Sequence, residues 1–226
     1  RVLLVDLDPQ GHLTIGLGFS KKVPVTLKNM LENIVMGIKF DPREVILHHE
    51  EGVDVIPSNK LLSGLDVSLI MAEDREIILR EYLMLLKEDY DFMIIDCMPS
   101  LGMLTINALT AADSILIPME PEYYAADGLM ELLKVYSAIK AKFNPDLKIE
   151  GIVFTFDTPT FNNSKRNKKA VINAYGDKIR IFKESIPRAV TIAETASEGI
   201  SIFAYDGSGK GAQSYQKLVE GVLDHA

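Results

Sequence analysis

Short apolar runs rich in β-branched residues alternate with helix-like patterns along the whole chain. This alternation is the sequence signature of βαβ units, whose parallel strands are buried by helices on both faces of the sheet. The expected strands lie at residues 2–5, 53–56, 92–95, 114–117, 149–154 and 179–182. We therefore predict an α/β fold with a mainly parallel, twisted sheet and helices on both faces.

Apolar residues at helical spacing separate these runs. The three clearest sets are Leu27, Met30, Leu31 and Ile34; Leu129, Leu132, Leu133 and Tyr136; and Tyr215, Leu218, Val219 and Val222. Each set predicts a helix with one side turned to the core. Two polar loops, at residues 158–163 and 206–211, lie between the predicted elements, and loops at strand ends are common places for ligands to bind.

The length and composition of the chain favour one globular domain over residues 1–226. Of the 226 residues, 47% are hydrophobic and 25% are charged, which is typical of a larger domain that needs no disulfide. The single cysteine, Cys97, is expected to be a small buried residue, and the lack of a signal peptide or a membrane-length apolar run predicts a cytoplasmic protein. With a net charge of -8, any contact with nucleic acid must come from a local basic patch.

Carboxylates follow two of the predicted strands. Asp6 and Asp8 end the first strand, where alternation would place both on the same side; they could hold a hydrated cation, position a water, or simply lie at a solvated strand end. Asp96 follows the apolar run at residues 92–95, as in a Walker-B motif. Because Mg²⁺ needs only one or two carboxylates beside nucleotide phosphates, Asp96 is a candidate ligand. Asp8 and Asp96 end different strands and could converge on one ligand.

Several separated blocks of the sequence resemble one family. They read V-L-L-V-D-L-D-P-Q-G, D-C-M-P-S-L-G with L-T-I-N-A-L, E-Y-Y-A-A-D-G-L and S-I-P-R-A-V-T-I-A-E. In this order they resemble the ParA/Soj branch of the MinD-like ATPases, and the resemblance runs from Arg1 almost to the C-terminus. It implies a P-loop NTPase-like fold, with ATP and Mg²⁺ as cofactors.

The resemblance also implies roles for single residues. Asp8 would help to set up the water that attacks the γ-phosphate of ATP, and Asp96 would hold Mg²⁺ through water. The other nucleotide-binding residues that it implies are Asp6 and Gln10 in the first switch segment, Pro99 and Ser100 in the second, and Pro187 and Arg188 at the adenine pocket. The implied chemistry is in-line phosphoryl transfer to water, in which positioning and charge neutralisation supply most of the catalysis.

A biological role follows from the same resemblance. ATP would favour a homodimer, the dimer would engage nonspecific DNA, and a ParB-like centromere-binding partner would stimulate hydrolysis, so that plasmid or chromosome DNA is partitioned on the nucleoid. The C-terminus, V-E-G-V-L-D-H-A, lacks the Lys- and Arg-rich anchor of a MinD-like regulator, which argues against stable membrane association. A MinD-like regulatory ATPase, an interaction module without a P-loop and a flavodoxin-like receiver are the alternatives.

The chain departs from the family because residues 1–226 contain neither K-G-G-V-G-K-T nor any other G-x-x-x-x-G-K-S/T segment. This P-loop supplies the backbone N–H groups and the lysine that hold the phosphates. We expect an N-terminally truncated domain that does not itself hydrolyse ATP. In the family the missing strand lies in the middle of the sheet, beside the strand that ends at Asp96. Its backbone partners should then be unpaired, so we expect re-pairing, exchange with another chain, or low stability.

The residues expected to contact DNA also differ from the family pattern. Pro159 and Thr191 stand where family members commonly have arginines. The basic residues that could replace them are Lys165, Arg166, Lys168, Lys169 and Lys210. Nonspecific DNA binding needs several such cations to release counterions from the phosphates. The same run could equally be an ordinary solvated helix face.

Overall fold

The computed structural model describes residues 1–20, 22–70, 72–158 and 160–224. The chain divides into two compact units. The first comprises Arg1–Ala112, Ala138–Pro145 and Ala196–Ile200, and the second comprises Asp113–Ser137, Asp146–Thr195 and Ser201–Ala226. The expectation of one domain over residues 1–226 stays a prediction.

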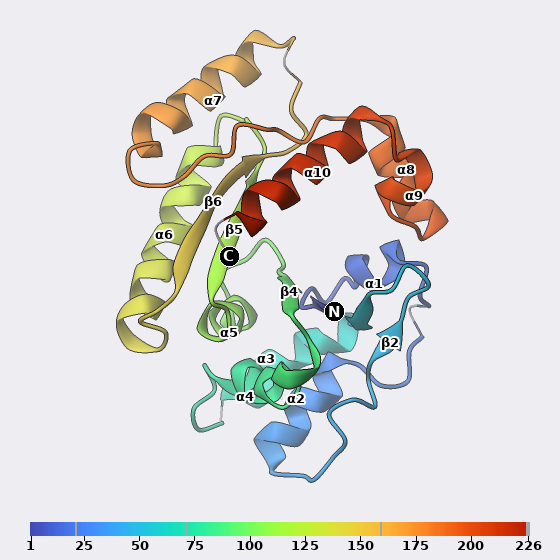
Figure 1. The fold of residues 1–226 in the computed structure, drawn as a ribbon. Helices are drawn as coiled ribbons and strands as arrows, with labels where there is room; N and C mark the ends of the chain where they lie inside the picture. The colour runs from blue at the N-terminus through green and yellow to red at the C-terminus, as the bar shows by residue number, and fades with distance from the viewer. Residues whose placement is uncertain (21, 71, 159, 225–226) are drawn as a thin grey trace. The chain divides into compact units, whose positions relative to one another are not determined.

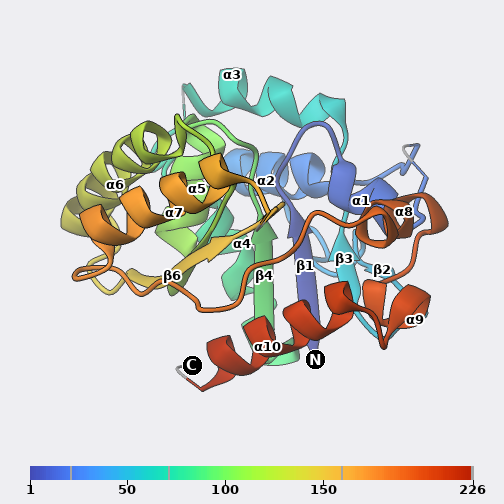
Figure 2. The same cartoon turned by 90° about the horizontal axis from the view of Figure 1, so that it is seen from above.

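A four-stranded sheet forms the centre of the first unit (Figure 1). Its strands are β1 (Val2–Asp6), β2 (Leu47–His48), β3 (Asp54–Ile56) and β4 (Phe92–Asp96), and Figure 2 shows them side by side in the order β2-β3-β1-β4. β1 pairs in parallel with β3 and β4, whereas β2 pairs antiparallel to β3. The parallel strands confirm the predictions for residues 2–5, 53–56 and 92–95. At two residues, β2 is too short to give a sequence pattern.

Helices cover one face of this sheet. The alternate strand residues Leu3 and Val5 are fully buried in one core with α2 (Leu27–Met36), α4 (Ile78–Met84) and α5 (Met103–Ala111). The apolar set predicted at residues 27–34 forms the buried side of α2, so this helix is confirmed. The shorter elements of the unit are α1 (His12–Gly16), η1 (Lys60–Gly64), α3 (Leu65–Ile70) and η2 (Lys87–Asp89).

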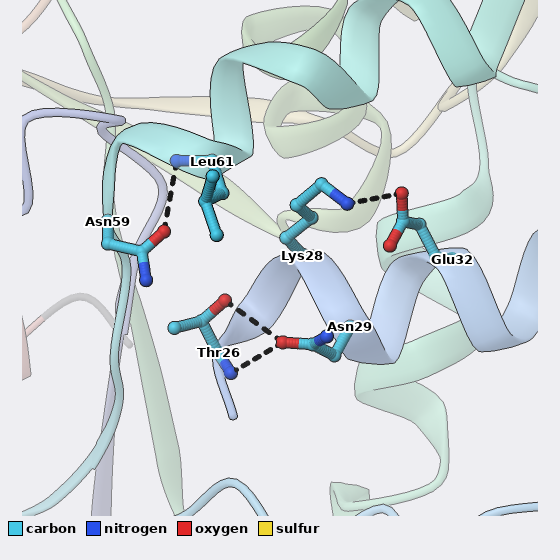
Figure 3. A network of polar contacts seen from close by, with 6 residues as sticks. All are labelled: Thr26, Lys28, Asn29, Glu32, Asn59 and Leu61. Atoms are coloured by element: carbon cyan, nitrogen blue, oxygen red, sulfur yellow. Dashed lines mark hydrogen bonds and ion pairs between the residues drawn. The ribbon is translucent and has the colours of Figure 1, made fainter. Parts of the chain in front are cut away.

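Side-chain caps fix the starts of α2 and η1 (Figure 3). The backbone N–H and the hydroxyl of Thr26 donate to Asn29 Oδ1 at 3.0 and 3.3 Å. Asn59 Oδ1 accepts from the Leu61 N–H at 3.0 Å. Such contacts satisfy polar groups that a helix start leaves unpaired, and the Asn59 cap lies in the loop that leaves β3.

The second unit is built around two parallel strands, β5 (Ser114–Met119) and β6 (Lys148–Phe154), which confirm the predictions for residues 114–117 and 149–154. Its helices are α6 (Ala125–Lys142), α7 (Asn162–Tyr175), α8 (Val190–Glu198), α9 (Ile202–Asp206) and α10 (Lys210–Leu223), and the last turns of α6 and α8 belong to the first unit. The helices predicted around residues 129–136 and 215–222 are present as α6 and α10.

Helices lie on both faces of β6 in the second unit. Figure 2 shows α6 and α7 on one side of this strand and α10 on the other. Ile152 and Phe154 share a buried cluster with Leu129 of α6, whereas Val153, between them, packs with Leu218 of α10. This alternation is what a strand buried on both faces requires.

The segment at residues 179–182, predicted as a strand, runs beside β6 without forming a regular strand. Ile152 and Ile181 form an isolated parallel bridge, in which the Phe182 N–H donates to the Ile152 carbonyl at 2.9 Å. The chain bends at Lys183 and rejoins the end of β6 at Ile186, whose N–H donates to the Phe154 carbonyl at 2.8 Å, before Pro187 bridges Asp157. The prediction was wrong because the bend cuts the ladder to single bridges.

Two predicted loops are shorter than expected because helices begin inside them. α10 begins at Lys210, within residues 206–211, and Gly211 belongs to its first turn. A Cβ at Gly211 would lie 2.9 Å from Ile192 Cγ1, so this glycine serves close helix packing rather than a turn. α7 begins within residues 158–163, and Pro159 lies outside the described residues.

Strands β4 and β5 each have one side that is not paired with another described strand. Within the described residues, β4 has a paired neighbour in β1 and β5 has one in β6, and neither strand is paired on its other side. The side chains of Phe92 and Ile94 on β4 are 44% and 55% exposed, and Leu116 on β5 is 39% exposed. The expected unpaired edges are therefore present, and re-pairing has not closed them.

Candidate functional site

Asp6 lies at the end of β1 and is fully buried. Its Oδ2 atom accepts hydrogen bonds from the backbone N–H and the hydroxyl of Thr14, at 2.9 and 2.6 Å, and its Oδ1 atom accepts from the Asp8 N–H at 3.2 Å. Burial raises the pKa of Asp6 above its ordinary value, although the hydrogen bonds from Thr14 lower it in part. Asp6 thus holds α1 to the end of β1, and its contact with a nucleotide stays a prediction.

Asp8 and Gln10 lie in the tight turn that joins β1 to α1. Asp8 is half-buried, and its Oδ1 atom accepts from the Gln10 N–H at 2.8 Å. Gly11 has a φ of 67°, and a Cβ there would lie 2.8 Å from the Ser58 carbonyl oxygen, so the turn requires glycine. Because β1 ends at Asp6, strand alternation does not reach Asp8. The two carboxylates have different surroundings instead of sharing one side of a strand.

Asp96 is the last residue of β4, so it lies at the same carboxyl-terminal end of the sheet as Asp6. It is the register partner of Asp6, and its carbonyl accepts from the Leu7 N–H at 2.9 Å. Desolvation, followed by the negative charges of Asp6 and Asp8, raises the pKa of Asp96 above its ordinary value, and His12 opposes the rise. Clustered carboxylates that raise one another's pKa suit a bound cation, which would relieve the repulsion.

The carboxylates of Asp8 and Asp96 fit a magnesium ion whose other ligands are waters and the phosphates of a nucleotide. No group of three or more metal-ligating side chains occurs among the described residues. Mg²⁺ does not need such a group, because it keeps several waters and binds one or two carboxylates together with phosphates. Asp96, with Asp8 nearby, is the part of such a site that this chain can supply.

Pro99 and Ser100 lie in the loop between β4 and α5, and both are exposed. The Ser100 N–H donates to the Met98 carbonyl at 2.8 Å, and the Ser100 carbonyl accepts from the Thr105 hydroxyl at the start of α5. Cys97, expected to be buried, is exposed, because the open edge of β4 leaves the loop after it uncovered. The loop is thus tied to α5 while its outer side chains are free to meet a ligand.

Pro187 and Arg188 belong to the second unit. Pro187 bridges Asp157 in the loop after β6, and the Arg188 N–H donates to the Asp157 carbonyl at 3.2 Å. The Arg188 guanidinium lies 3.7 Å from the Glu120 carboxylate and 5.3 Å from the centre of the Phe156 ring. The backbone of this segment is therefore held against the end of β6, with the arginine side chain at the surface.

A buried ion pair was not predicted from the sequence. Asp157 is 5% exposed, and its carboxylate accepts from Lys168 Nζ at 2.7 Å and from the Ser164 hydroxyl at 2.9 Å. Lys168 Nζ also donates to Ser185 Oγ at 2.8 Å. Lys168 thus differs from the other members of the basic run, because its charge is neutralised inside the second unit.

The remaining basic candidates are exposed. Lys165, Arg166 and Lys169 lie on α7, and Lys210 begins α10. Lys210 also lines a cavity of about 200 Å³, whose other lining residues are Asp157, Ser185, Pro187, Gln213, Ser214 and Lys217. The predicted basic helix face is present, and its binding to DNA stays a prediction.

Thr14 is a second residue that the sequence did not single out. It is fully buried, donates its hydroxyl to Asp6, and accepts from the Ser58 N–H at 3.0 Å. We expect Thr14→Val to lower the free energy of unfolding by about 2 kcal/mol, because it leaves the buried Ser58 N–H without its acceptor and removes one of the two hydrogen bonds to Asp6 Oδ2. Urea unfolding measures the loss. Thr14→Ser, which keeps the hydroxyl, is the control, and equal losses in the two variants would contradict the argument.

Comparisons with known proteins agree with this arrangement. A family model described as an AAA domain matches residues 1–149. The sporulation initiation inhibitor protein Soj of Bacillus subtilis is 40% identical over 226 residues, which cover 98% of this chain and 86% of the relative. The chromosome partitioning protein ParA of Myxococcus xanthus is 40% identical over 221 residues, which cover 96% and 75%.

A solved structure shares the fold. The cobyrinic acid a,c-diamide synthase of Mycobacterium smegmatis with bound ADP and magnesium is 34% identical and has a TM-score of 0.85, over 100% of this chain and 82% of that one. The similarity spans every element described above. It confirms the α/β class with a mainly parallel sheet.

Proposed function

Because the chain belongs to the ParA/Soj family of partition ATPases, we propose that the natural protein uses ATP hydrolysis to partition plasmid or chromosome DNA. The observation that carries the proposal is the placement of Asp6, Asp8 and Asp96 at the carboxyl ends of the paired strands β1 and β4. Ligands of open α/β sheets bind at this edge. The two 40% identical relatives, named for sporulation control and chromosome partitioning, support the same role.

The site residues divide the work of phosphoryl transfer. Asp8 would orient the attacking water, and Asp96 would hold Mg²⁺, which when bound would neutralise charge on the phosphates. Asp6 holds α1 and so places the turn that carries Asp8 and Gln10. The other proposed contacts are Pro99 and Ser100 to the γ-phosphate side of ATP, and Pro187 and Arg188 to the adenine.

The proposal requires a phosphate-binding loop, which the sequence of residues 1–226 does not contain. The test is to measure phosphate release from ATP and Mg²⁺ by the natural protein and by residues 1–226 side by side. We expect hydrolysis by the natural protein and none by residues 1–226, which lack the backbone cradle and the lysine. A natural protein that neither binds nor hydrolyses ATP would refute the proposal and favour an interaction module.

The proposal includes two assembly steps. ATP favours a homodimer, and a ParB-like centromere-binding partner stimulates hydrolysis. Sedimentation with and without a non-hydrolysable ATP analogue measures the first step, and the partner's effect on phosphate release measures the second. A protein that stays monomeric with the analogue would contradict the switch.

We propose that DNA binding uses the exposed cations of α7 and the start of α10, which are Lys165, Arg166, Lys169 and Lys210. Lys168 is left out because it is paired with Asp157. We expect the triple variant Lys165→Ala, Arg166→Ala and Lys169→Ala to weaken nonspecific DNA binding about tenfold or more. We also expect it to reduce the slope of log affinity against log salt by about 2 to 3, one unit for each lost phosphate contact. Fluorescence anisotropy over a salt series measures both.

A matched control removes exposed lysines elsewhere. Lys39→Ala with Lys142→Ala changes the net charge in the same direction without touching α7 or α10. Its salt slope should equal that of the unchanged protein. Equal effects of both variants would show that only the overall charge matters, and that α7 carries an ordinary solvated face.

A MinD-like regulator would dock on membranes instead. Among the described helices, none is long and apolar enough to span a membrane. Docking needs no span, so co-sedimentation with anionic vesicles in the presence of ATP is the discriminating measurement. Retention of the protein on vesicles but not on DNA would favour the regulator.

A further inference from the structure

Helix α1, which follows the Asp8 turn, is held at both of its ends. At its start, Thr14 binds the buried Asp6 and the loop after β3. At its far end, Gly18 meets Gly199, which directly follows α8. A Cβ at Gly199 would lie 2.8 Å from Gly18 Cα, and both glycines have positive φ, 77° and 71°. The two segments can approach this closely only because position 199 is glycine, whereas Gly18 is favoured by its positive φ.

His49 reinforces this second contact. Its Nε2 atom lies 3.0 Å from the Gly199 carbonyl oxygen, and its Nδ1 atom lies 3.2 Å from the Glu51 backbone nitrogen. Because the carbonyl can only accept and the backbone N–H can only donate, the two contacts make Nε2 the donor and Nδ1 the acceptor. The ring also meets Phe19, just beyond α1, edge to face at 5.9 Å between centroids. Both ring nitrogens of this half-buried side chain thus have partners, and the ring packs against Phe19.

We propose that His49 and Gly199 are positioning residues for ATP hydrolysis, because they hold the far end of α1 and thereby the turn that carries Asp8. This inference rests on the proposed function. Neither residue needs to touch the nucleotide. α1 has only five residues, and so short a helix is not stable on its own. Its geometry, and that of the turn before it, depends on what holds its two ends.

The proposal predicts a loss of precision rather than a loss of binding. If α1 were held at one end only, the Asp8 turn before it would sample more conformations. Small displacements of a catalytic group lower the reaction rate far more than they lower the affinity for the substrate. ATP is bound by other parts of the site, so the KM for ATP should change little. The expected signature is a lower kcat together with faster local opening of α1.

Hydrogen exchange measures the local opening without any ligand. In the natural protein, His49→Ala should speed exchange of the amides of residues 15–18 about threefold to tenfold, the effect of one lost hydrogen bond. Three of these amides donate within α1 or at its end, from Ile15 to Gly11, from Leu17 to Leu13 and from Gly18 to Ile15. His49→Gln, whose side-chain N–H can replace the Nε2 donor, should return exchange toward that of the unchanged protein.

His48→Ala is the matched control, because His48 is exposed and contacts Asp54 rather than Gly199. It should change neither exchange in α1 nor kcat. His49→Ala should lower kcat about tenfold, with recovery in His49→Gln. If the natural protein hydrolyses ATP and His49→Ala leaves both kcat and exchange unchanged, the positioning role is refuted and the proposed function stands. If the natural protein hydrolyses no ATP, the proposed function fails, and the positioning role fails with it.

Discussion

Asp8→Asn is expected to lower the rate of ATP hydrolysis by the natural protein about 10²- to 10³-fold, the usual contribution of a group that positions or activates an attacking water. Asparagine keeps an oxygen that can accept the Gln10 N–H, which Asp8 accepts at 2.8 Å, so the turn should survive. What is lost is the negative charge beside the water. Single-turnover phosphate release measures the rate, and calorimetry shows whether ATP still binds.

A control for the same turn chemistry is available at Asp41. Its Oδ1 atom accepts from the Arg43 N–H at 2.9 Å, two residues on, as Asp8 does with Gln10. Asp41→Asn should leave hydrolysis unchanged. Nearly full activity in Asp8→Asn would show that the turn, rather than the charge, is what hydrolysis needs, and would remove Asp8 from its proposed role.

Lys168→Ala is expected to lower the free energy of unfolding by about 3 kcal/mol, because it leaves the carboxylate of Asp157 buried without its cation. Burial acts to raise the pKa of Asp157, but the hydrogen bonds from Lys168 and Ser164 outweigh it and hold the pKa below the ordinary 3.8. An acid with a lowered folded pKa stabilises the fold at higher pH and loses this effect as pH falls through that pKa. The difference in free energy of unfolding between the unchanged protein and Lys168→Ala should be full at pH 7 and shrink below about pH 4.

Lys169→Ala, one residue further on, is the natural comparison. Lys169 is exposed, so its removal should change stability by less than about 0.5 kcal/mol. The two variants should therefore rank in opposite orders by stability, measured by urea unfolding, and by DNA affinity, measured by fluorescence anisotropy. Lys168→Ala would lose stability, and Lys169→Ala would lose DNA affinity. If Lys168→Ala instead lost only DNA affinity, the ion pair would be unimportant and Lys168 would return to the DNA-binding set.

The strands and the acids that end them could be predicted because local rules govern them. A strand buried on both faces reads as a short β-branched run, as at residues 2–5 and 92–95. A carboxylate just after such a run must lie at the carboxyl-terminal end of the strand, which is where Asp96 is found. The alternation rule failed only beyond Asp6, because the strand had ended and a turn had begun.

The environment of Lys168 could not be read from its neighbours in the basic run, but helical spacing carried a signal. Ser164, Lys168 and Val171 are four and three residues apart, the spacing of one helix side, and Ser164 and Val171 are buried. Lys168 therefore turns inward, whereas Lys165 and Lys169 remain exposed. Its partner Asp157 lies outside the helix, and no local pattern identifies such a partner.

The open edges of β4 and β5 have a practical consequence for handling residues 1–226. A free row of backbone N–H and C=O groups is a template for a strand of another molecule, and Phe92 and Ile94 add apolar surface to it. Self-association should therefore rise steeply with protein concentration. Added salt would not prevent it, because screening acts on charges and neither backbone pairing nor apolar contact depends on them. Dilution is the condition that keeps such molecules apart.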